Sequence, residues 1–139
     1  MIIALNGSDK ADYPHYFNAM HRIRAEVFAT RLNWDVRVEN GFERDRFDDV
    51  NPLYLISIDE RTGRVRGSVR LMPTTGPNML RDVFPSLIPN EEIVESATIW
   101  ECSRFSIEKG CDVPPLVSWL VVPLANCSPP SLRLVYWLD

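Results

Sequence analysis

Residues 53–71 read LYLISIDERTGRVRGSVRL, and this stretch decides the fold class. Residues 53–59 and 64–71 are rich in β-branched and apolar side chains, and the turn between them ends in Gly63. They predict two strands joined as an antiparallel hairpin. Because side chains alternate along a strand, we expect Val65, Val69 and Leu71 on one face and Arg70 on the opposite, polar face.

A third β-rich stretch, residues 98–107, reads TIWECSRFSI. Regular alternation places Glu101 on one face with Phe105, and Arg104 on the other. A carboxylate among apolar neighbours either pairs with a cation or has its pKa raised by burial, and both are marks of a working site. A β-bulge would bring Glu101 and Arg104 to the same face. The alternative is an ordinary edge-strand carboxylate.

A helix is predicted over residues 14–31, with Pro14 in its first turn. Apolar side chains recur on it at helical spacing: Phe17, Met20, Ile23, Val27 and Phe28. Arg24 lies on the same stripe. A buried guanidinium needs a carboxylate partner, because removing the partner of a buried charge costs about 3–5 kcal/mol. The alternative is that the Arg24 side chain runs along the helix edge to solvent.

Residues 33–51 form a long, charge-dense segment that contains Trp34, Asp45 and Asp48. A loop of this length in a compact domain is usually functional. Its carboxylates are possible partners for Arg24, and Trp34 offers a flat surface for a planar or cationic ligand. The alternative is a solvated charged loop.

Composition and charge exclude several classes of function. The net charge of −4 argues against a phosphate-backbone binder, so we expect no nucleic-acid partner. The long uncharged run in residues 113–132 contains five prolines, which excludes a transmembrane helix there. The N-terminus has no basic leader, and we therefore expect a cytoplasmic protein without a membrane partner.

Motifs for metal and nucleotide chemistry are missing from the sequence. Cys102, Cys111 and Cys127 have no metal-ligand spacing, and no glycine-rich phosphate loop is present. His15 and His21 lie six residues apart on the predicted helix, and we expect both at the surface. We therefore predict no metal site and no cofactor. The residues alone predict an α/β domain with a charged pocket of arginines and carboxylates.

The chain divides into two segments of different composition. Residues 1–112 carry every charged residue except Arg133 and Asp139, whereas residues 113–139 hold five of the eleven prolines. We expect residues 1–112 to form the domain and residues 113–139 to be an atypical, proline-rich apolar tail.

An ordered set of motifs resembles the LuxI-type acyl-homoserine-lactone synthases, the autoinducer synthase family of bacterial quorum sensing. The set comprises Arg24, Phe28 and Trp34, then ERDRFD at 43–48, YL at 54–55, GSVRLMPT at 67–74, FP at 84–85 and ECSRF at 101–105. The resemblance implies a fold like that of GNAT acyltransferases, with a twisted mixed sheet and helices on its faces. It also implies a V-shaped gap between two splayed strands, which we assign to residues 64–71 and 98–107.

The resemblance implies a transferase that acylates the amine of S-adenosylmethionine and then forms a lactone with release of methylthioadenosine. The acyl donor is a thioester of acyl carrier protein or coenzyme A, and S-adenosylmethionine is a substrate rather than a cofactor. Glu101 is then the expected general base, through a water, and Arg104 the second catalytic residue and a holder of the substrate carboxylate. The expected substrate-binding residues are Arg24, Phe28, Trp34, Asp45, Asp48 and Arg70.

The family pattern ends near Cys111, so we expect the C-terminal part of the fold to be incomplete, through truncation or a shifted reading frame. Two alternatives to an active synthase follow. One is an inactive fragment of a synthase, and the other is a non-enzymatic interaction module that pairs through an exposed sheet edge.

Overall fold

The computed structural model describes residues 1–87, 95–111 and 133–136 of the 139-residue chain. Its elements in chain order are β1 (Ile2–Asn6), the 3₁₀ helix η1 (Gly7–Ala11), α1 (Pro14–Arg24), the π-helix η2 (Ala25–Arg31), β2 (Val38–Glu39), β3 (Phe42–Glu43), the 3₁₀ helix η3 (Arg46–Asp49), β4 (Leu53–Ile58), β5 (Val65–Pro73), α2 (Met79–Asp82), the 3₁₀ helix η4 (Pro85–Leu87), β6 (Ile99–Ile107) and β7 (Arg133–Tyr136).

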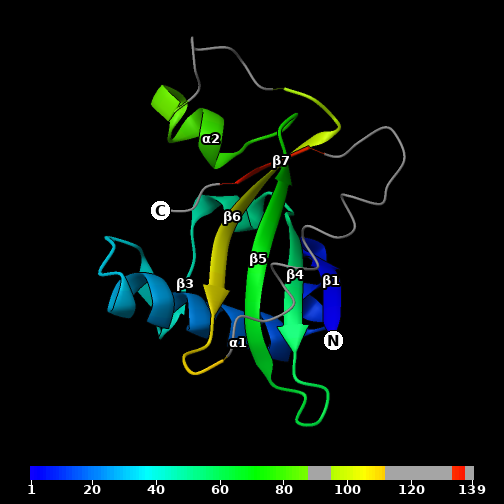
Figure 1. Ribbon diagram of the computed structural model, residues 1–139, viewed down its shortest axis with the longest axis vertical. Coiled ribbons are helices and arrows are strands. Elements are labelled where there is room, and N and C mark those ends of the chain that lie inside the picture. Colours follow the sequence, from blue (N-terminus) through cyan, green and yellow to red (C-terminus); the bar gives the residue numbers. More distant parts are fainter. Residues whose placement is uncertain (88–94, 112–132, 137–139) are drawn as a thin grey trace.

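Five of these strands form one sheet in the order β1-β4-β5-β6-β7, while β2 and β3 form a separate short ribbon. The neighbours from β1 to β6 pair antiparallel, and β6 pairs parallel with β7, so the sheet is mixed. Figure 1 shows α1 behind the sheet and α2 beyond one end of β5. The expected mixed sheet with flanking helices is confirmed.

The predicted hairpin forms from β4 and β5, with Tyr54 opposite Arg70. The placement of Val65 with Val69 and Leu71 was wrong. Ser57 pairs with Gly67 but Ile58 pairs with Val65, so β5 carries one extra residue at this point. This bulge inverts the alternation, and Val65 packs in the α1-side core while Val69 and Leu71 line the other face.

The predicted helix begins at Pro14 and continues beyond Arg24 as the π-helix η2. All five residues of its apolar stripe are buried, and they pack on Tyr54, Ile56 and Ile58 of β4. The helix ends where Asn33 adopts φ +53°, a left-handed conformation that asparagine tolerates better than most residues. Arg24 is therefore the last residue before the wider π turns, a geometry often found at functional sites.

The expected gap between residues 64–71 and 98–107 was wrong. β5 and β6 are hydrogen-bonded neighbours from Gly67 opposite Ile107 to Pro73 opposite Trp100. Two adjacent antiparallel strands with alternating polar and apolar faces form ladder hydrogen bonds along their length, so no wedge opens between them. The parallel pairing of β6 with β7 covers Ile99 to Cys102 of β6.

Residues 113–132 and 137–139 of the expected tail lie outside the described residues. Residues 133–136 form β7 at the edge of the sheet. Among the described residues, no helix combines the length and the hydropathy needed to cross a bilayer.

Candidate functional site

Three arginines and three carboxylates form a closed ring of ion pairs between the sheet and α1. In order around the ring, the members are Arg24, Glu43, Arg104, Asp45, Arg70 and Asp48, and the last pairs again with the first. The six nitrogen–oxygen distances lie between 2.6 and 3.2 Å. Each arginine bridges two carboxylates, and each carboxylate bridges two arginines. We call this arrangement the ion-pair ring.

The ring is assembled from elements that are far apart in the sequence. Arg24 ends α1, Arg70 lies on β5 and Arg104 lies on β6, while Glu43 belongs to β3. Asp45 is the N-cap of η3, where its carboxylate accepts from the Phe47 backbone amide, and Asp48 follows within η3. This local capping geometry fixes both aspartates toward the arginines.

Burial of the ring is almost complete. The side chains of Arg24, Glu43, Asp48 and Arg70 are at most 1% exposed, whereas those of Arg104 and Asp45 are 12% and 19% exposed. The solvent-directed alternative for Arg24 is therefore wrong. The solvated-loop alternative is wrong for Glu43 and Asp48, whereas residues 33–35 and 37–41 of the same segment are exposed. The expected pairing of Asp45 and Asp48 with arginines is present.

The ring holds Asp48 and Asp45 in the charged form. Burial by itself would raise the pKa of Asp48, but Arg24 and Arg70 outweigh it and hold the pKa of that carboxyl far below its usual range. Asp48 accepts from both terminal nitrogens of Arg24, at 2.7 and 3.0 Å, and from the Tyr54 hydroxyl at 2.6 Å. Asp45 behaves similarly, since Arg70 overcomes the effect of burial and lowers its pKa.

Glu101 lies beside the ring but is not part of it. Its side chain is fully buried, and Oε2 accepts from the Leu80 backbone amide at 2.6 Å. Among the described residues, Oε1 has no hydrogen-bond partner. Burial raises the pKa of Glu101, against the opposing effects of the Leu80 amide and of Arg70. Of the two outcomes expected for this carboxylate, the structure favours the raised pKa, because Glu101 has no ion-pair partner among the described residues.

The strand β6 carries the bulge that would place Glu101 and Arg104 together. Ser68 pairs with Ser106 but Arg70 pairs with Ser103, so β6 has an extra residue, and Arg104 has φ +53°. A left-handed conformation costs a non-glycine residue about 1–2 kcal/mol. The bulge turns Arg104 toward the ring and sends Phe105 to the opposite face with Trp100 and Cys102. The regular alternation that grouped Phe105 with Glu101 was therefore wrong.

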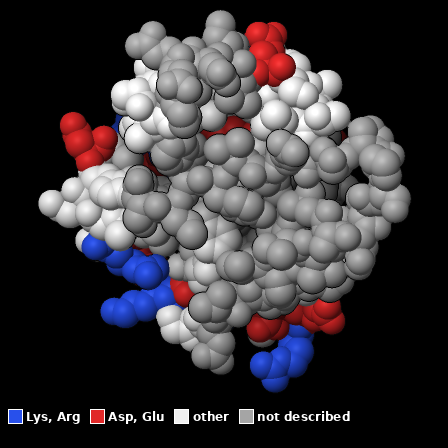
Figure 2. Space-filling view, turned by 45° about the horizontal axis from the view of Figure 1, so that its top comes forward, with Lys and Arg blue, Asp and Glu red and all other residues white. Residues whose placement is uncertain are grey.

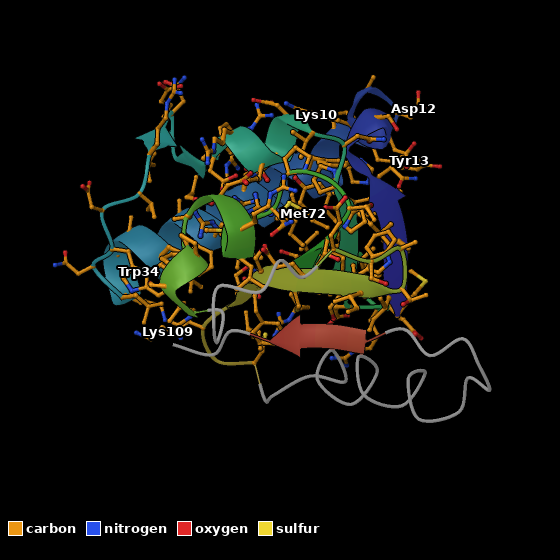
Figure 3. The ribbon with its side chains drawn as sticks, turned by 90° about the horizontal axis from the view of Figure 1, so that it is seen from above. Lys10, Asp12, Tyr13, Trp34, Met72 and Lys109 are labelled. Carbon is orange, nitrogen blue, oxygen red and sulfur yellow. The ribbon has the colours of Figure 1, made fainter. Side chains whose placement is uncertain are left out.

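Phe28 and Trp34 form an aromatic platform next to Arg104. Their rings stack at 5.1 Å with an interplanar angle of 14°, and the Arg104 guanidinium lies 5.3 Å from the Phe28 ring. Phe28 is buried, whereas Trp34 is 37% exposed. Figure 3 shows Trp34 at the end of the molecule away from Lys10 and Tyr13, on the same side of the view as Lys109.

Several residues of the site were missed by the sequence interpretation. Glu43 completes the ring from a short strand that no periodicity marks, and the Tyr54 hydroxyl supports Asp48 from β4. The Met79 sulfur lies 3.2 Å from a terminal nitrogen of Arg70. His21 was wrongly expected at the surface: it is 3% exposed, and its Nδ1 lies 2.8 Å from the Glu43 carbonyl oxygen. Its position one turn before Arg24 was the available signal.

A groove of about 440 Å³ borders the ring on the side of β2, β3 and η3. Asp45 is the one predicted site residue on its wall; Phe28, Trp34 and Glu101 do not line it. The groove is therefore separate from the aromatic platform. On the face shown in Figure 2, the coloured basic side chains are interspersed with acidic ones and do not form one basic patch.

The described residues contain no group of histidine, cysteine or acidic side chains placed to hold a metal ion. Cys102 and Cys111 are free thiols, and burial raises the pKa of Cys102 to about 12. Cys127 lies outside the described residues. The site thus offers the charged groups of the ion-pair ring, the buried Glu101 carboxyl outside the ring, and an aromatic surface.

Comparison with known proteins gives a consistent result. The family described as autoinducer synthase matches residues 10–118. The chain is 38% identical over 107 residues to the acyl-homoserine-lactone synthase of Agrobacterium fabrum (strain C58), which covers 77% of this chain and 50% of that protein. It is 40% identical over 111 residues to the acyl-homoserine-lactone synthase of Pseudomonas aeruginosa (strain PAO1), which covers 79% and 55%. The chain spans about half the length of these curated relatives.

The fold is similar to solved structures of the same kind. The structure of BjaI, described as a CoA-dependent acyl-homoserine lactone synthase with SAM and isopentyl-CoA, superposes with a TM-score of 0.76 at 31% identity. The match covers 88% of this chain and 58% of that chain. The acyltransferase-like fold expected from the resemblance is confirmed.

Proposed function

Because the chain belongs to the autoinducer synthase family, we propose that it carries the S-adenosylmethionine end of the active site of an acyl-homoserine-lactone synthase. The reaction transfers an acyl group from a thioester to the α-amine of S-adenosylmethionine. The acylated intermediate then closes to a lactone and releases methylthioadenosine. S-Adenosylmethionine is consumed as a substrate, and the scheme uses no cofactor.

The observation that carries this proposal is the open edge of the ion-pair ring. Arg104 and Asp45 are the two members that reach solvent, and they carry opposite charges 2.9 Å apart. The amino acid end of S-adenosylmethionine also carries opposite charges on neighbouring atoms. Its carboxylate can take the place of Asp45 on Arg104, while its ammonium pairs with Asp45, so two new charge-assisted contacts replace one.

The aromatic platform supports the same orientation of the substrate. Trp34 is half-exposed and stacked on Phe28, which lies directly against Arg104. A flat adenine or a cationic sulfonium gains attraction over the face of an indole ring. With the amino acid group at Arg104, the rest of S-adenosylmethionine extends along this platform.

Arg24, Asp48 and Arg70 support the site from within. Their side chains are at most 1% exposed and fully engaged with each other, so they hold Arg104 and Asp45 in place rather than contact the substrate. Desolvated charges that are paired on all sides are costly to rearrange. This gives the open edge a fixed geometry before the substrate arrives.

Glu101 supplies the base in this scheme. The substrate amine is an ammonium ion at neutral pH and must lose a proton before it attacks, and Glu101, acting through a water, accepts it. The nitrogen then bonds to the acyl carbon, the carbon–sulfur bond of the thioester breaks, and the second proton lost by the nitrogen passes to the departing thiolate, which leaves as the thiol. In the second step the substrate carboxylate attacks the carbon next to the sulfonium, and the bond to sulfur breaks as methylthioadenosine departs.

The acyl donor is a thioester of acyl carrier protein or of coenzyme A. BjaI is described as CoA-dependent, whereas the thioester carbon that reacts is the same for both donors. Both substrates are cytoplasmic metabolites, so we place the reaction in the cytoplasm. The scheme involves neither nucleic acid nor a membrane.

The test is a direct assay of the purified chain. Two reactions are prepared, and both contain the chain and S-adenosylmethionine. One also contains a mixture of acyl-coenzyme A thioesters, and the other contains acylated carrier protein. Mass spectrometry then measures acyl-homoserine lactone and methylthioadenosine, which we expect in equal amounts. Glu101→Gln, which keeps an acceptor for the Leu80 amide, is the matched inactive control.

Other outcomes contradict specific parts of the proposal. Binding of S-adenosylmethionine in calorimetry without any product indicates a fragment that binds but does not turn over. The absence of binding, together with self-association in size-exclusion chromatography, indicates an interaction module instead.

A further inference from the structure

His21 and Arg24 lie one turn apart on α1, and both side chains reach Glu43. Nδ1 of His21 is 2.8 Å from the Glu43 backbone carbonyl oxygen, while Nε of Arg24 is 2.6 Å from the Glu43 carboxylate. His21 is 3% exposed and Glu43 is fully buried. Helix α1 thus contacts Glu43 of β3 at two points: His21 contacts the Glu43 backbone, and Arg24 contacts the Glu43 side chain.

The hydrogen bond has a defined direction, because a carbonyl oxygen only accepts. Nδ1 of His21 must therefore carry the proton. Burial, with the nearby Arg24, lowers the pKa of His21 to about 4, against the opposing effects of Asp48 and the Glu43 carbonyl, and Arg44 acts in the same direction as Arg24. The imidazole of His21 is therefore neutral at physiological pH, with Nε2 unprotonated.

Besides His21, the backbone around Glu43 is held by the short ribbon of β2 and β3 and by the Arg44 amide, which donates to the Arg37 carbonyl at 3.3 Å. β3 has two residues, and its partner β2, also of two residues, is exposed. Their ladder consists of two residue pairs, Val38 with Glu43 and Glu39 with Phe42. A ribbon this short is marginal in water without packing from another element.

The position of Glu43 in turn decides the orientation of Arg104. One Glu43 carboxylate oxygen accepts from Arg24 and the other accepts from Nε of Arg104 at 3.2 Å. Arg104 has one further carboxylate partner, Asp45, which lies at the open edge of the ring. If Glu43 shifts, Nε of Arg104 loses its carboxylate partner. The Arg104 guanidinium can then change its orientation at the open edge of the ring.

We propose that His21 is a positioning residue of the ion-pair ring: its Nδ1–H holds the backbone of Glu43 so that the Glu43 carboxylate orients Arg104 toward the carboxylate of an amino acid substrate. This inference rests on the proposed function for the identity of that substrate. It assigns to this histidine a role in the recognition of the amino acid group and none in the recognition of the adenosine group.

The test compares two ligands by isothermal titration calorimetry. S-Adenosylmethionine has an amino acid group, and methylthioadenosine has none. We expect His21→Leu to weaken S-adenosylmethionine binding about tenfold, as for the loss of one buried hydrogen bond, and to change methylthioadenosine binding by less than about twofold. His21→Asn places an amide N–H near the position of Nδ1–H, and we expect it to restore most of the affinity for S-adenosylmethionine.

His15→Leu is the matched control, because His15 lies on the same helix and is exposed. If His21→Leu weakens the binding of both ligands equally, His21 has a purely structural role and the proposal is overturned. Unchanged binding of both ligands would also overturn the proposal. If wild-type protein binds neither ligand, the proposed function fails, and a ligand-free measurement still decides the positioning role.

That measurement is the nuclear magnetic resonance signal of the arginine Nε–H groups. Arg24 and Arg104 both donate through Nε to Glu43. We expect both signals to shift in His21→Leu, to return toward the wild-type positions in His21→Asn, and to stay unchanged in His15→Leu. Unchanged signals in His21→Leu would show that Glu43 stays in place without His21.

Discussion

Arg104 and Asp45 form the ion pair at which the buried ring meets solvent. Their nearest nitrogen and oxygen atoms are 2.9 Å apart, and their side chains are 12% and 19% exposed, whereas the other four members are at most 1% exposed. Three positive and three negative charges balance within the ring. A ligand that brings one charge of each sign can therefore enter at this edge and leave the ring neutral.

The open edge predicts the effect of Asp45→Asn. Asparagine remains a good N-cap for η3, so the local fold is retained, but the negative charge that meets the substrate ammonium is lost. We expect S-adenosylmethionine binding to weaken roughly 10- to 100-fold in calorimetry. Asp49→Asn is the control, because Asp49 is 77% exposed and has a single distant partner, Arg44, at 3.8 Å. Equal effects of the two substitutions would refute a specific role for Asp45.

The buried side of the ring predicts that Arg24→Ala destabilises the fold. Removing this guanidinium leaves Glu43 and Asp48 buried with one cationic partner fewer each. We expect the free energy of unfolding to fall by about 3–5 kcal/mol in urea denaturation. Arg22→Ala, on the same helix, removes an exposed guanidinium that lies 5.1 Å from the Phe42 ring, and its effect should stay below about 1 kcal/mol. A loss for Arg24→Ala no larger than this control would contradict the prediction.

Tyr54→Phe isolates the hydrogen bond that supports Asp48 from β4. The Tyr54 hydroxyl donates to Asp48 at 2.6 Å, and this environment raises the pKa of Tyr54 through burial and the Asp48 charge. We expect a loss of about 1.5–3 kcal/mol in the free energy of unfolding, as for a hydrogen bond to a charged group. Tyr16→Phe, at a half-buried tyrosine on α1, provides the comparison. Similar small losses in both would show that Asp48 does not depend on Tyr54.

Glu101 predicts the pH dependence of the reaction. A general base acts when deprotonated, and burial raises the pKa of Glu101 above the ordinary value of 4.5. The value of kcat/KM, which reports ionisation of the free enzyme, should therefore rise with pH through a midpoint above 4.5. Glu101→Gln should abolish turnover at every pH while it retains binding of S-adenosylmethionine. Wild-type turnover in Glu101→Gln would eliminate the assignment of the base.

The same shift predicts how stability depends on pH. The folded state holds the Glu101 proton to a higher pH than the unfolded state does, so this group contributes full stability below about 4.5 and loses it as the pH rises through the folded pKa. The glutamine in Glu101→Gln cannot ionise. The free energy of unfolding of this variant, relative to that of wild type, should therefore increase as the pH rises through that window. Parallel pH profiles for the two proteins, measured by urea denaturation, would contradict the raised pKa.

Local sequence patterns were sufficient for the helix and the hairpin near the site, but not for β3 and η3. The helix was predicted from five apolar residues at helical spacing, and the hairpin from two β-rich runs around a turn that ends in Gly63. Arg24 was flagged because a charge on an apolar stripe requires a partner, and it has two. The face of Val65 and the face of Phe105 were predicted wrongly, because a single extra residue in a strand inverts the alternation and leaves no mark in composition.

By itself, the sequence determined which residues carry charge, which faces of α1 and the hairpin are apolar, and which family the motifs resemble. The tertiary structure decided that three arginines and three carboxylates close into one ring, that Glu43 is one of its six members, and that His21 contacts the Glu43 backbone. It also decided that Arg104 and Asp45 alone among the six members open to solvent. The reason is physical: periodicity reports contacts within one helix or strand, whereas the ring joins α1, β3, η3, β5 and β6, whose approach depends on the packing of the whole core. Burial then sets which of these charges are fixed by their partners and which remain free to meet a substrate.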